Sequence, residues 1–118
     1  MTTEQEVFDK AVQHLLTQNA KSLTNEGCAY RGNGGLMCGV GPFIKDECYT
    51  EEMEGSSAGR LFNDWPEALT FERDENIEQL LRLVQNVHDW SQVEDWSDRL
   101  QRLGEARGLT FNPPKVPA

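Results

Sequence analysis

The stretch CAYRGNGGLMCGVG, residues 28–41, holds five of the ten glycines of this 118-residue chain. Its apolar side chains alternate with small or polar ones, as in a β-strand, whereas the segments on either side have helical spacing. The Asn and Gly residues at its centre are typical of a tight turn between two strands. We therefore predict an antiparallel β-hairpin over about residues 28–40.

Two registers of this hairpin are possible. A two-residue turn at 33–34 would place Cys28 and Cys38 on opposite faces, whereas a three-residue loop at 32–34 would pair the two cysteines. The second register collects its apolar side chains on one face, which holds Cys28, Tyr30, Leu36, Cys38 and Val40. Because burial of one face fixes strand register, we expect the three-residue loop.

Helices are predicted on both sides of the hairpin. Three segments with amphipathic spacing follow the capping residues Thr3, Asp74 and Ser91. Thr3 and Ser91 are each followed three residues later by Glu, which is the capping-box pattern. Two shorter helices are expected, one over 47–54 and one that begins after Ser56 or Ser57 and stops before Pro66.

These elements predict an α+β, mostly helical fold. Three main helices and two short ones would pack on the small antiparallel hairpin, because an isolated hairpin is only marginally stable in water. The length suits one domain, which we place over residues 1–111. The proline-rich residues 112–118 are expected to form an extended C-terminal tail.

The charge of the chain is unevenly distributed. The net charge is −9, and residues 46–98 contain 15 acidic residues against three arginines. An acidic surface repels phosphate, so direct nucleic-acid binding is not expected. The same charge suits a protein partner with a basic surface, although a charged surface that serves solubility alone is the simpler interpretation.

The composition also indicates the environment of the chain. Acidic side chains at Glu4, Glu6 and Asp9 do not fit a secretory signal, and no apolar run is long enough to cross a membrane. An odd number of cysteines, three, argues against a disulfide framework. We expect reduced thiols, a cytoplasmic location and no membrane partner.

Two groups of residues are candidates for chemistry. Cys28, Cys38 and His88 could hold a metal ion or a small ligand, but their spacing lacks the Cys-x-x-Cys pattern of zinc sites. His88 lies on an apolar stripe, where a hydrogen-bonded core histidine is the alternative. A cysteine nucleophile would combine Cys38 with His88 and Asp89, yet adjacent helix positions point apart, so Asp89 is poorly placed to orient His88. We expect no enzyme activity and no cofactor.

Acidic and aromatic residues are the candidates for a binding surface. Exposed Trp beside carboxylates would anchor a partner, because aromatic residues dominate interface energetics. The alternative is that the tryptophans at 65, 90 and 96 are buried in the core. The predicted partner-binding residues are Glu51, Glu52, Glu54, Asp64, Trp90, Asp95 and Asp98.

The hairpin motif Cys-Ala-Tyr-Arg-Gly-x-Gly-Gly-Leu-x-Cys-x-Val-Gly resembles a group of short proteins encoded by phages and prophages. The segments at 44–47 and 52–55 extend the resemblance over most of the chain, as does the segment from Leu83 to Asp89, which ends in Val-His-Asp. Cys48 departs from the group, in which an acidic residue is more usual at that position. The resemblance implies a phage source and no particular reaction, so no catalytic residue follows from it.

Small acidic phage proteins often act by binding a host protein. We therefore expect a non-enzymatic accessory protein that binds a host protein through its acidic region, for example to inhibit a host defence or nucleic-acid enzyme, as anti-CRISPR proteins do. The alternative is a small metal-binding or ligand-binding module centred on Cys28, Cys38 and His88.

Overall fold

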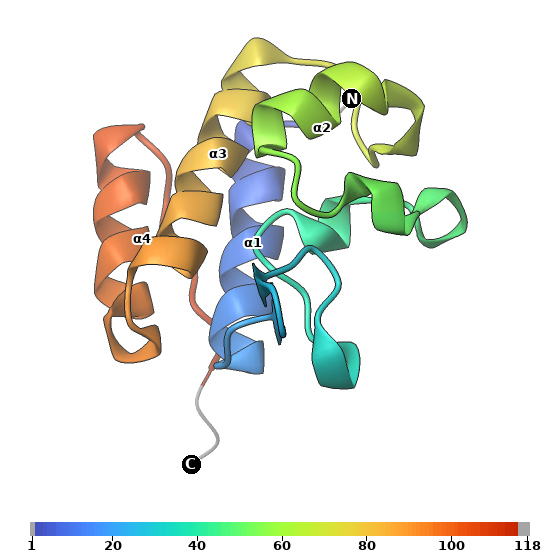
Figure 1. Ribbon diagram of the computed structural model, residues 1–118. Helices are drawn as coiled ribbons and strands as arrows, with labels where there is room; N and C mark the ends of the chain where they lie inside the picture. Colours follow the sequence, from blue (N-terminus) through green and yellow to red (C-terminus); the bar gives the residue numbers. More distant parts are fainter. Residues whose placement is uncertain (1, 116–118) are drawn as a thin grey trace.

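The structure is a computed structural model that describes residues 2–115 (Figure 1). It contains four α-helices: α1 (Glu4–Gln18), α2 (Ala58–Asp64), α3 (Glu75–Trp90) and α4 (Trp96–Ala106). Helix α3 is central, because it contacts the other three helices, and α1 also packs against α4. The predicted α+β, mostly helical fold is confirmed.

The helix starts follow from their capping residues. At α1 the Thr3 hydroxyl accepts a hydrogen bond from the Glu6 amide at 3.2 Å, and the Glu6 carboxylate accepts one from the Thr3 amide at 3.3 Å. The Asp74 carboxylate caps α3 by accepting from two backbone amides, and Ser57 caps α2. These contacts satisfy amide groups that the helices themselves leave unpaired, as the sequence predicts.

The capping box predicted at Ser91 does not form. The Ser91 amide instead donates to the Val87 carbonyl oxygen at 3.2 Å, so Ser91 ends α3. The chain then passes through a 3-10 turn, Val93–Asp95, and α4 begins at Trp96, whose side chain is fully buried. Packing of this large indole in the core sets the start of α4 in place of the local capping pattern.

The short helix predicted over residues 47–54 is wrong. Two 3-10 turns, Asp46–Cys48 and Glu51–Met53, occupy this stretch, and the backbone between them is extended. The Glu54 carboxylate accepts hydrogen bonds from the Tyr30 amide at 2.8 Å, the Arg31 amide at 3.0 Å and the Tyr49 hydroxyl. These long-range bonds hold the segment against residues 30–31, which a continuous helix would not allow.

The hairpin lies earlier in the chain than predicted. Strand β1 (Leu23–Thr24) pairs antiparallel with β2 (Gly27–Cys28), and Leu23 is opposite Cys28. Between residues 30 and 38 the structure has a single bridge, Arg31 to Met37, closed by the turn Asn33–Gly35. Neither predicted register occurs: Cys28 is exposed at the surface, whereas Cys38 is buried.

Helix α1 explains this difference. The Met37 amide donates to the Gln18 side chain at 3.0 Å, and the Met37 carbonyl oxygen accepts from Gln18 at 2.8 Å and from His14 at 2.9 Å. The second half of the glycine-rich stretch is therefore tied to α1 and does not pair with residue 28. Gly34 and Gly35 both have positive φ, 72° and 77°, which moves the loop one residue along the chain.

The buried apolar side chains form one contiguous cluster between α1, α2, α3, α4 and residues 38–44. Residues after α4 return along α1, since the Gln5 side chain exchanges two hydrogen bonds of 2.9 Å with the Thr110 backbone. The start of the predicted tail is also held there, because the Gln13 side chain donates to the Asn112 carbonyl oxygen. Residues 116–118 of that tail lie outside the described residues.

In the part of the chain that the structure describes, no helix combines the length and the apolar character needed to cross a membrane.

Candidate functional site

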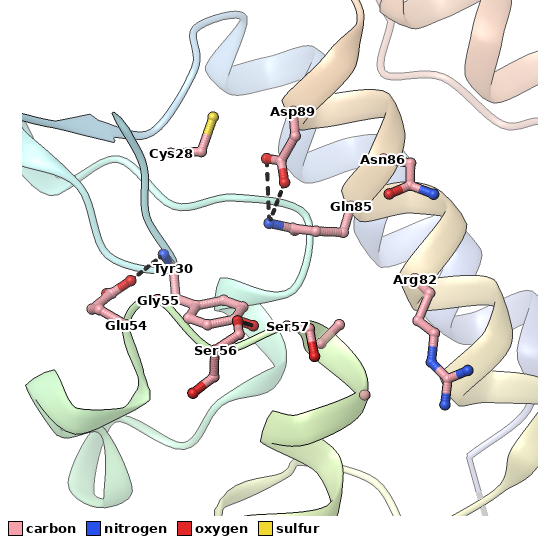
Figure 2. Close-up of a pocket in the computed structure, with 12 residues that line it drawn as sticks. Cys28, Tyr30, Glu54, Gly55, Ser56, Ser57, Arg82, Gln85, Asn86 and Asp89 are labelled. Carbon is pink, nitrogen blue, oxygen red and sulfur yellow. Dashed lines mark hydrogen bonds between the residues drawn. The ribbon is translucent and has the colours of Figure 1, made fainter. Parts of the chain in front are cut away.

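A cleft of about 790 Å³ lies between α3 and the segment 54–59 that leads into α2 (Figure 2). Helix α3 contributes Arg82, Gln85, Asn86 and Asp89, which share one face because their spacing is three, four and seven residues. The opposite wall is residues 54–59, with Cys28 and Tyr30 beside it. We call this space the α3 cleft. Its lining combines polar and apolar surface in similar amounts, which suits a ligand that has both hydrogen-bonding groups and an apolar part.

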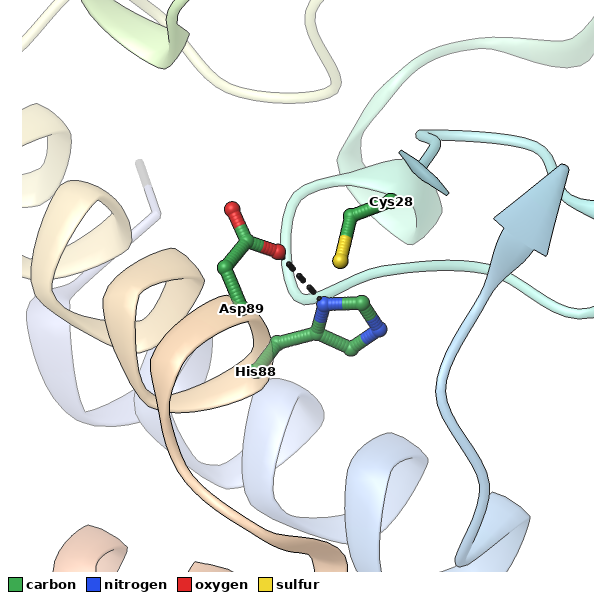
Figure 3. A group of neighbouring side chains, drawn as sticks. All are labelled: Cys28, His88 and Asp89. Atoms are coloured by element: carbon green, nitrogen blue, oxygen red, sulfur yellow. Dashed lines mark hydrogen bonds and ion pairs between the residues drawn. The ribbon is translucent and has the colours of Figure 1, made fainter. Parts of the chain in front are cut away.

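His88 lies behind the cleft and is fully buried (Figure 3). Its Nε2 atom accepts a hydrogen bond from the Ser22 amide at 3.0 Å, and its Nδ1 atom lies 2.7 Å from an Asp89 carboxylate oxygen. Because a backbone amide can only donate, Nε2 carries no proton and Nδ1 donates to Asp89. His88 is therefore a hydrogen-bonded core histidine, the alternative weighed against a ligand role.

The expectation that Asp89 is poorly placed to orient His88 is wrong. The Asp89 carboxylate turns across the end of the imidazole ring, although the two residues are adjacent on α3 (Figure 3). Its short side chain reaches Nδ1 without the residues having to share a helix face. The sequence pattern missed this contact because helix spacing describes where Cβ atoms point and not how the side chains fold back.

The donor atoms of Cys28, His88 and Asp89 all lie within 4.8 Å of one another (Figure 3). Cys38 is not part of this group, so the set Cys28, Cys38 and His88 predicted for a metal or ligand is not brought together. A metal ion on Nδ1 would require loss of its proton while Nε2 still accepts from Ser22. The ring would then be an imidazolate, so these residues fit a hydrogen-bond network better than a metal ion.

The thiols near the cleft are poor nucleophiles. Burial raises the pKa of Cys38 to about 12, and desolvation together with the neighbouring Asp89 carboxylate raises the pKa of Cys28. Both thiols stay protonated at neutral pH, and the thiolate is the reactive form. A cysteine enzyme centred on Cys38 predicts the opposite shift, so the electrostatics argue against it.

Four predicted acidic residues lie on one side of the molecule. Glu51 and Glu52 are exposed on the 3-10 turn Glu51–Met53, and Asp64 is exposed at the end of α2, where it pairs with Arg60 at 3.2 Å. Glu54 is half-buried and accepts three hydrogen bonds. Its carboxylate therefore holds the loop together and is not presented to a partner.

The other three predicted residues lie on the opposite side. Figure 1 shows the segment 46–54 and helix α4 on either side of α1 and α3. Trp90, at the end of α3, is 85% exposed, and Asp95 and Asp98 are exposed on the 3-10 turn Val93–Asp95 and on α4. Asp98 pairs with Arg102 at 3.0 Å. The seven predicted residues therefore do not form one continuous surface.

A second concave surface lies between α3 and α4 beside Trp90. Its volume is about 340 Å³, and its walls are Leu83, Asn86, Val87, Trp90, Ser91, Arg99 and Leu103. We call it the Trp90 groove. The signal for it in the sequence is the spacing of residues 83, 87 and 90, which places three large apolar side chains on one stripe of α3. The packing of α4 beside that stripe is what the sequence does not reveal.

The three tryptophans have different environments. Trp96 is fully buried and lies against His88, with ring centroids 5.4 Å apart, and Trp65 is half-buried against the core. Trp65 and Trp96 therefore fit the alternative weighed in the sequence analysis, in which the tryptophans are buried in the core. Trp90 is different, because it and Leu23 are the large hydrophobic side chains that are exposed within residues 2–115.

Comparison of this chain with models of protein families, with curated proteins and with solved structures gives no match. The function must therefore be argued from the surfaces described above and the residues that line them.

Proposed function

We propose that this protein is a non-enzymatic binding protein that docks a basic segment of another protein into the Trp90 groove. The observation that carries the proposal is Trp90, an indole 85% exposed at the edge of an apolar groove. Exposing so large an apolar side chain is unfavourable in a protein that never covers it. Tryptophan is also among the residues most enriched at the energetic centres of protein interfaces.

Charge supports a basic partner. Residues 86–98 include four acidic residues, at 89, 94, 95 and 98, and neither Lys nor Arg. These carboxylates surround the sequence position of Trp90 and would attract cationic side chains during encounter. Arg99 is the charged residue of the groove wall, so the acceptor groups of such a segment would lie there and its cationic side chains beside the carboxylates at 94, 95 and 98.

The resemblance of the hairpin motif to phage and prophage proteins makes a host protein the expected partner. In that setting the protein would act in the host cytoplasm, and covering a basic surface on a host defence or nucleic-acid enzyme would inhibit it, as anti-CRISPR proteins do. Such inhibition would not require this protein to bind nucleic acid, which its net charge of −9 makes unfavourable.

Trp90→Ala tests the proposal, with Leu23→Ala as a matched control. Both variants remove an exposed hydrophobic side chain, but Leu23 lies on β1, outside the groove. The partner is first captured from host lysate and purified. Trp90→Ala is expected to weaken the affinity for this partner about 30-fold, which corresponds to about 2 kcal/mol. Leu23→Ala should leave the affinity unchanged, as isothermal titration calorimetry would show.

Charge reversal separates the two acidic sides. Asp95→Lys is expected to slow association, whereas the double variant Glu51→Lys, Glu52→Lys should not. If the Glu51→Lys, Glu52→Lys variant loses partner binding and Trp90→Ala keeps it, the partner binds on the side of residues 51–64 and not in the Trp90 groove. A concentration-dependent dimer abolished by Trp90→Ala in sedimentation experiments would mean that a second copy covers the groove, and would overturn the basic partner.

A further inference from the structure

The α3 cleft presents two opposite charges on one helix face. Arg82 and Asp89 are seven residues apart, close to two helical turns, and both line the cleft (Figure 2). This spacing separates their Cα atoms by about 10 Å along the helix axis. The two charges lie in this order along the cleft wall, so an extended ligand with a cationic and an anionic end matches their arrangement. This feature is independent of the Trp90 groove.

Asp89 is held ready to receive a cation. Its carboxylate accepts a hydrogen bond from His88 Nδ1 at 2.7 Å, and the Gln85 amide nitrogen lies 3.4 Å from both of its oxygens (Figure 2). These side-chain donors are neutral and orient the carboxylate, while the Lys21 ammonium group lies nearby and donates to the Asp89 backbone carbonyl oxygen at 3.4 Å. Two carboxylate oxygens offer about four acceptor positions, which leaves capacity for a ligand.

Arg82 is placed to receive an anion. Its side chain is exposed, and within residues 2–115 it takes part in no ion pair or hydrogen bond. Its guanidinium group lies over the start of α2, where a Cβ atom added to Gly59 would be 3.5 Å from both its Nε and Nη2 atoms. Guanidinium recognises a carboxylate through two parallel hydrogen bonds, so Arg82 is suited to an anionic group of a ligand.

Glu54 is the third charged residue in the cleft wall, but it is already occupied. Its carboxylate accepts from the Tyr30 and Arg31 amides and from the Tyr49 hydroxyl. Asp89 is therefore the carboxylate that remains for a ligand. Among the residues that line the cleft, the formal charges of Glu54, Asp89 and Arg82 sum to −1, which complements a ligand of net charge +1.

We propose that the α3 cleft binds a basic amino acid with a free carboxylate, with its cationic side chain at Asp89 and its carboxylate at Arg82. Free arginine fits this description, and so does an arginine at the C-terminus of a peptide. A volume of about 790 Å³ lies in the range of small-molecule sites and admits either source.

Titration of the ¹⁵N-labelled protein, followed by NMR, tests the proposal with four probes. L-Arginine is expected to shift the Gln85 side-chain amide signals. Agmatine lacks the carboxylate and L-citrulline lacks the positive charge, and each should bind about tenfold more weakly. The dipeptide Gly-Arg identifies the source: binding equal to that of arginine admits a peptide C-terminus, and weaker binding restricts the site to the free amino acid.

Variants assign each end of the ligand. Arg82→Gln should weaken arginine binding about tenfold and leave agmatine binding unchanged, because agmatine has no carboxylate to lose. Asp89→Asn keeps an acceptor for His88 and should weaken both ligands. Arg60→Gln is the matched control, since Arg60 is exposed on α2 outside the cleft and should have no effect.

Gly59→Glu gives a second test that removes none of the cleft side chains. The new carboxylate would lie beside the Arg82 guanidinium and compete with the ligand, so arginine binding should fall. Equal binding of arginine and citrulline, or no shift at about 10 mM arginine, which corresponds to a free energy weaker than about −2.7 kcal/mol, would overturn the proposal. Trp90→Ala should leave arginine binding unchanged, so failure of the cleft and failure of the groove are distinguishable.

Discussion

His88 is bonded at both ring nitrogens, by the Ser22 amide and by the Asp89 carboxylate, and these bonds determine what the residue can do. Neither nitrogen remains to bind a metal ion or to accept a proton from a substrate. The ring instead connects residue 22 to the last turn of α3 and fixes the direction of Asp89. One buried side chain thus links the packing of the core to the charge that faces the α3 cleft.

The three cysteines give a test at the scale of single residues. Cys28 is exposed, Cys48 is half-buried and Cys38 is buried, with its pKa raised to about 12. At neutral pH, iodoacetamide is expected to modify Cys28 and Cys48 slowly and to leave Cys38 unmodified until the protein unfolds, because alkylation requires an accessible thiolate. Mass spectrometry of peptides from native and urea-unfolded protein would measure this order. Rapid modification of native Cys38 would contradict its burial.

At the scale of elements, α1, α2 and α3 begin after residues that satisfy their first amide groups. Asp74 accepts from the Asn76 amide at 2.8 Å and from the Ile77 amide at 3.1 Å, and it thereby caps the helix that contacts all the others. Ser91 has the sequence of a cap but ends α3. The pair therefore offers a direct comparison between a capping pattern that forms and one that does not.

Asp74→Ala is expected to lower the free energy of unfolding by about 1 kcal/mol, because two amide groups of α3 lose their acceptor. Ser91→Ala should change it by less than about 0.5 kcal/mol, since no cap hydrogen bond to the Ser91 side chain exists. Urea unfolding followed by far-ultraviolet circular dichroism gives both values. An equal loss in the two variants would mean that Ser91 does cap α4 in solution.

Local patterns predicted the helices and failed at the glycine-rich stretch. Thr3, Ser57 and Asp74 carry their signal within three or four residues, so the starts of α1, α2 and α3 could be predicted. Residues 28–40 were assigned to a hairpin because their pairing was judged from alternation alone. Their conformation depends on Gln18 and His14 of α1, which bind Met37 across about twenty residues of sequence.

The candidate sites show the same division. Trp90, Cys28 and His88 could be picked out from the sequence as candidate site residues, because their residue types and positions are informative by themselves. The Trp90 groove needs α4 packed beside α3, and the α3 cleft needs residues 54–59 opposite α3, so neither has a local signal. The acidic residues at 51–64 and 95–98 belong to the same acidic region of the sequence but lie on two sides of the molecule (Figure 1).

At the scale of the whole molecule, the two ends of the described chain are joined along α1. The Gln5 side chain donates to the Thr110 carbonyl oxygen and accepts from the Thr110 amide, both at 2.9 Å. Arg107 pairs with Glu4 at 3.3 Å close by. The first helix and the segment after α4 therefore belong to one folding unit, which should unfold in a single transition.

Gln5→Ala is expected to lower the free energy of unfolding by about 1 kcal/mol, because both hydrogen bonds to Thr110 are lost at once. Gln101→Ala is the matched control: its side chain is exposed and makes one 3.4 Å contact, with Glu105 of the same helix. Urea unfolding should show one transition in both variants. Two separate transitions for Gln5→Ala would show that the end of the chain unfolds independently.

The contrast between the indoles of Trp90 and Trp96 has a spectroscopic consequence. Trp96 is shielded from water and lies against His88, whereas Trp90 is 85% exposed. Their fluorescence emission therefore differs in wavelength, with the Trp90 contribution at longer wavelength and open to a quencher such as acrylamide. Beside the half-buried Trp65, the unlabelled protein thus carries two contrasting natural probes: the emission of Trp90 follows the occupancy of its surface, and that of Trp96 follows the integrity of its core.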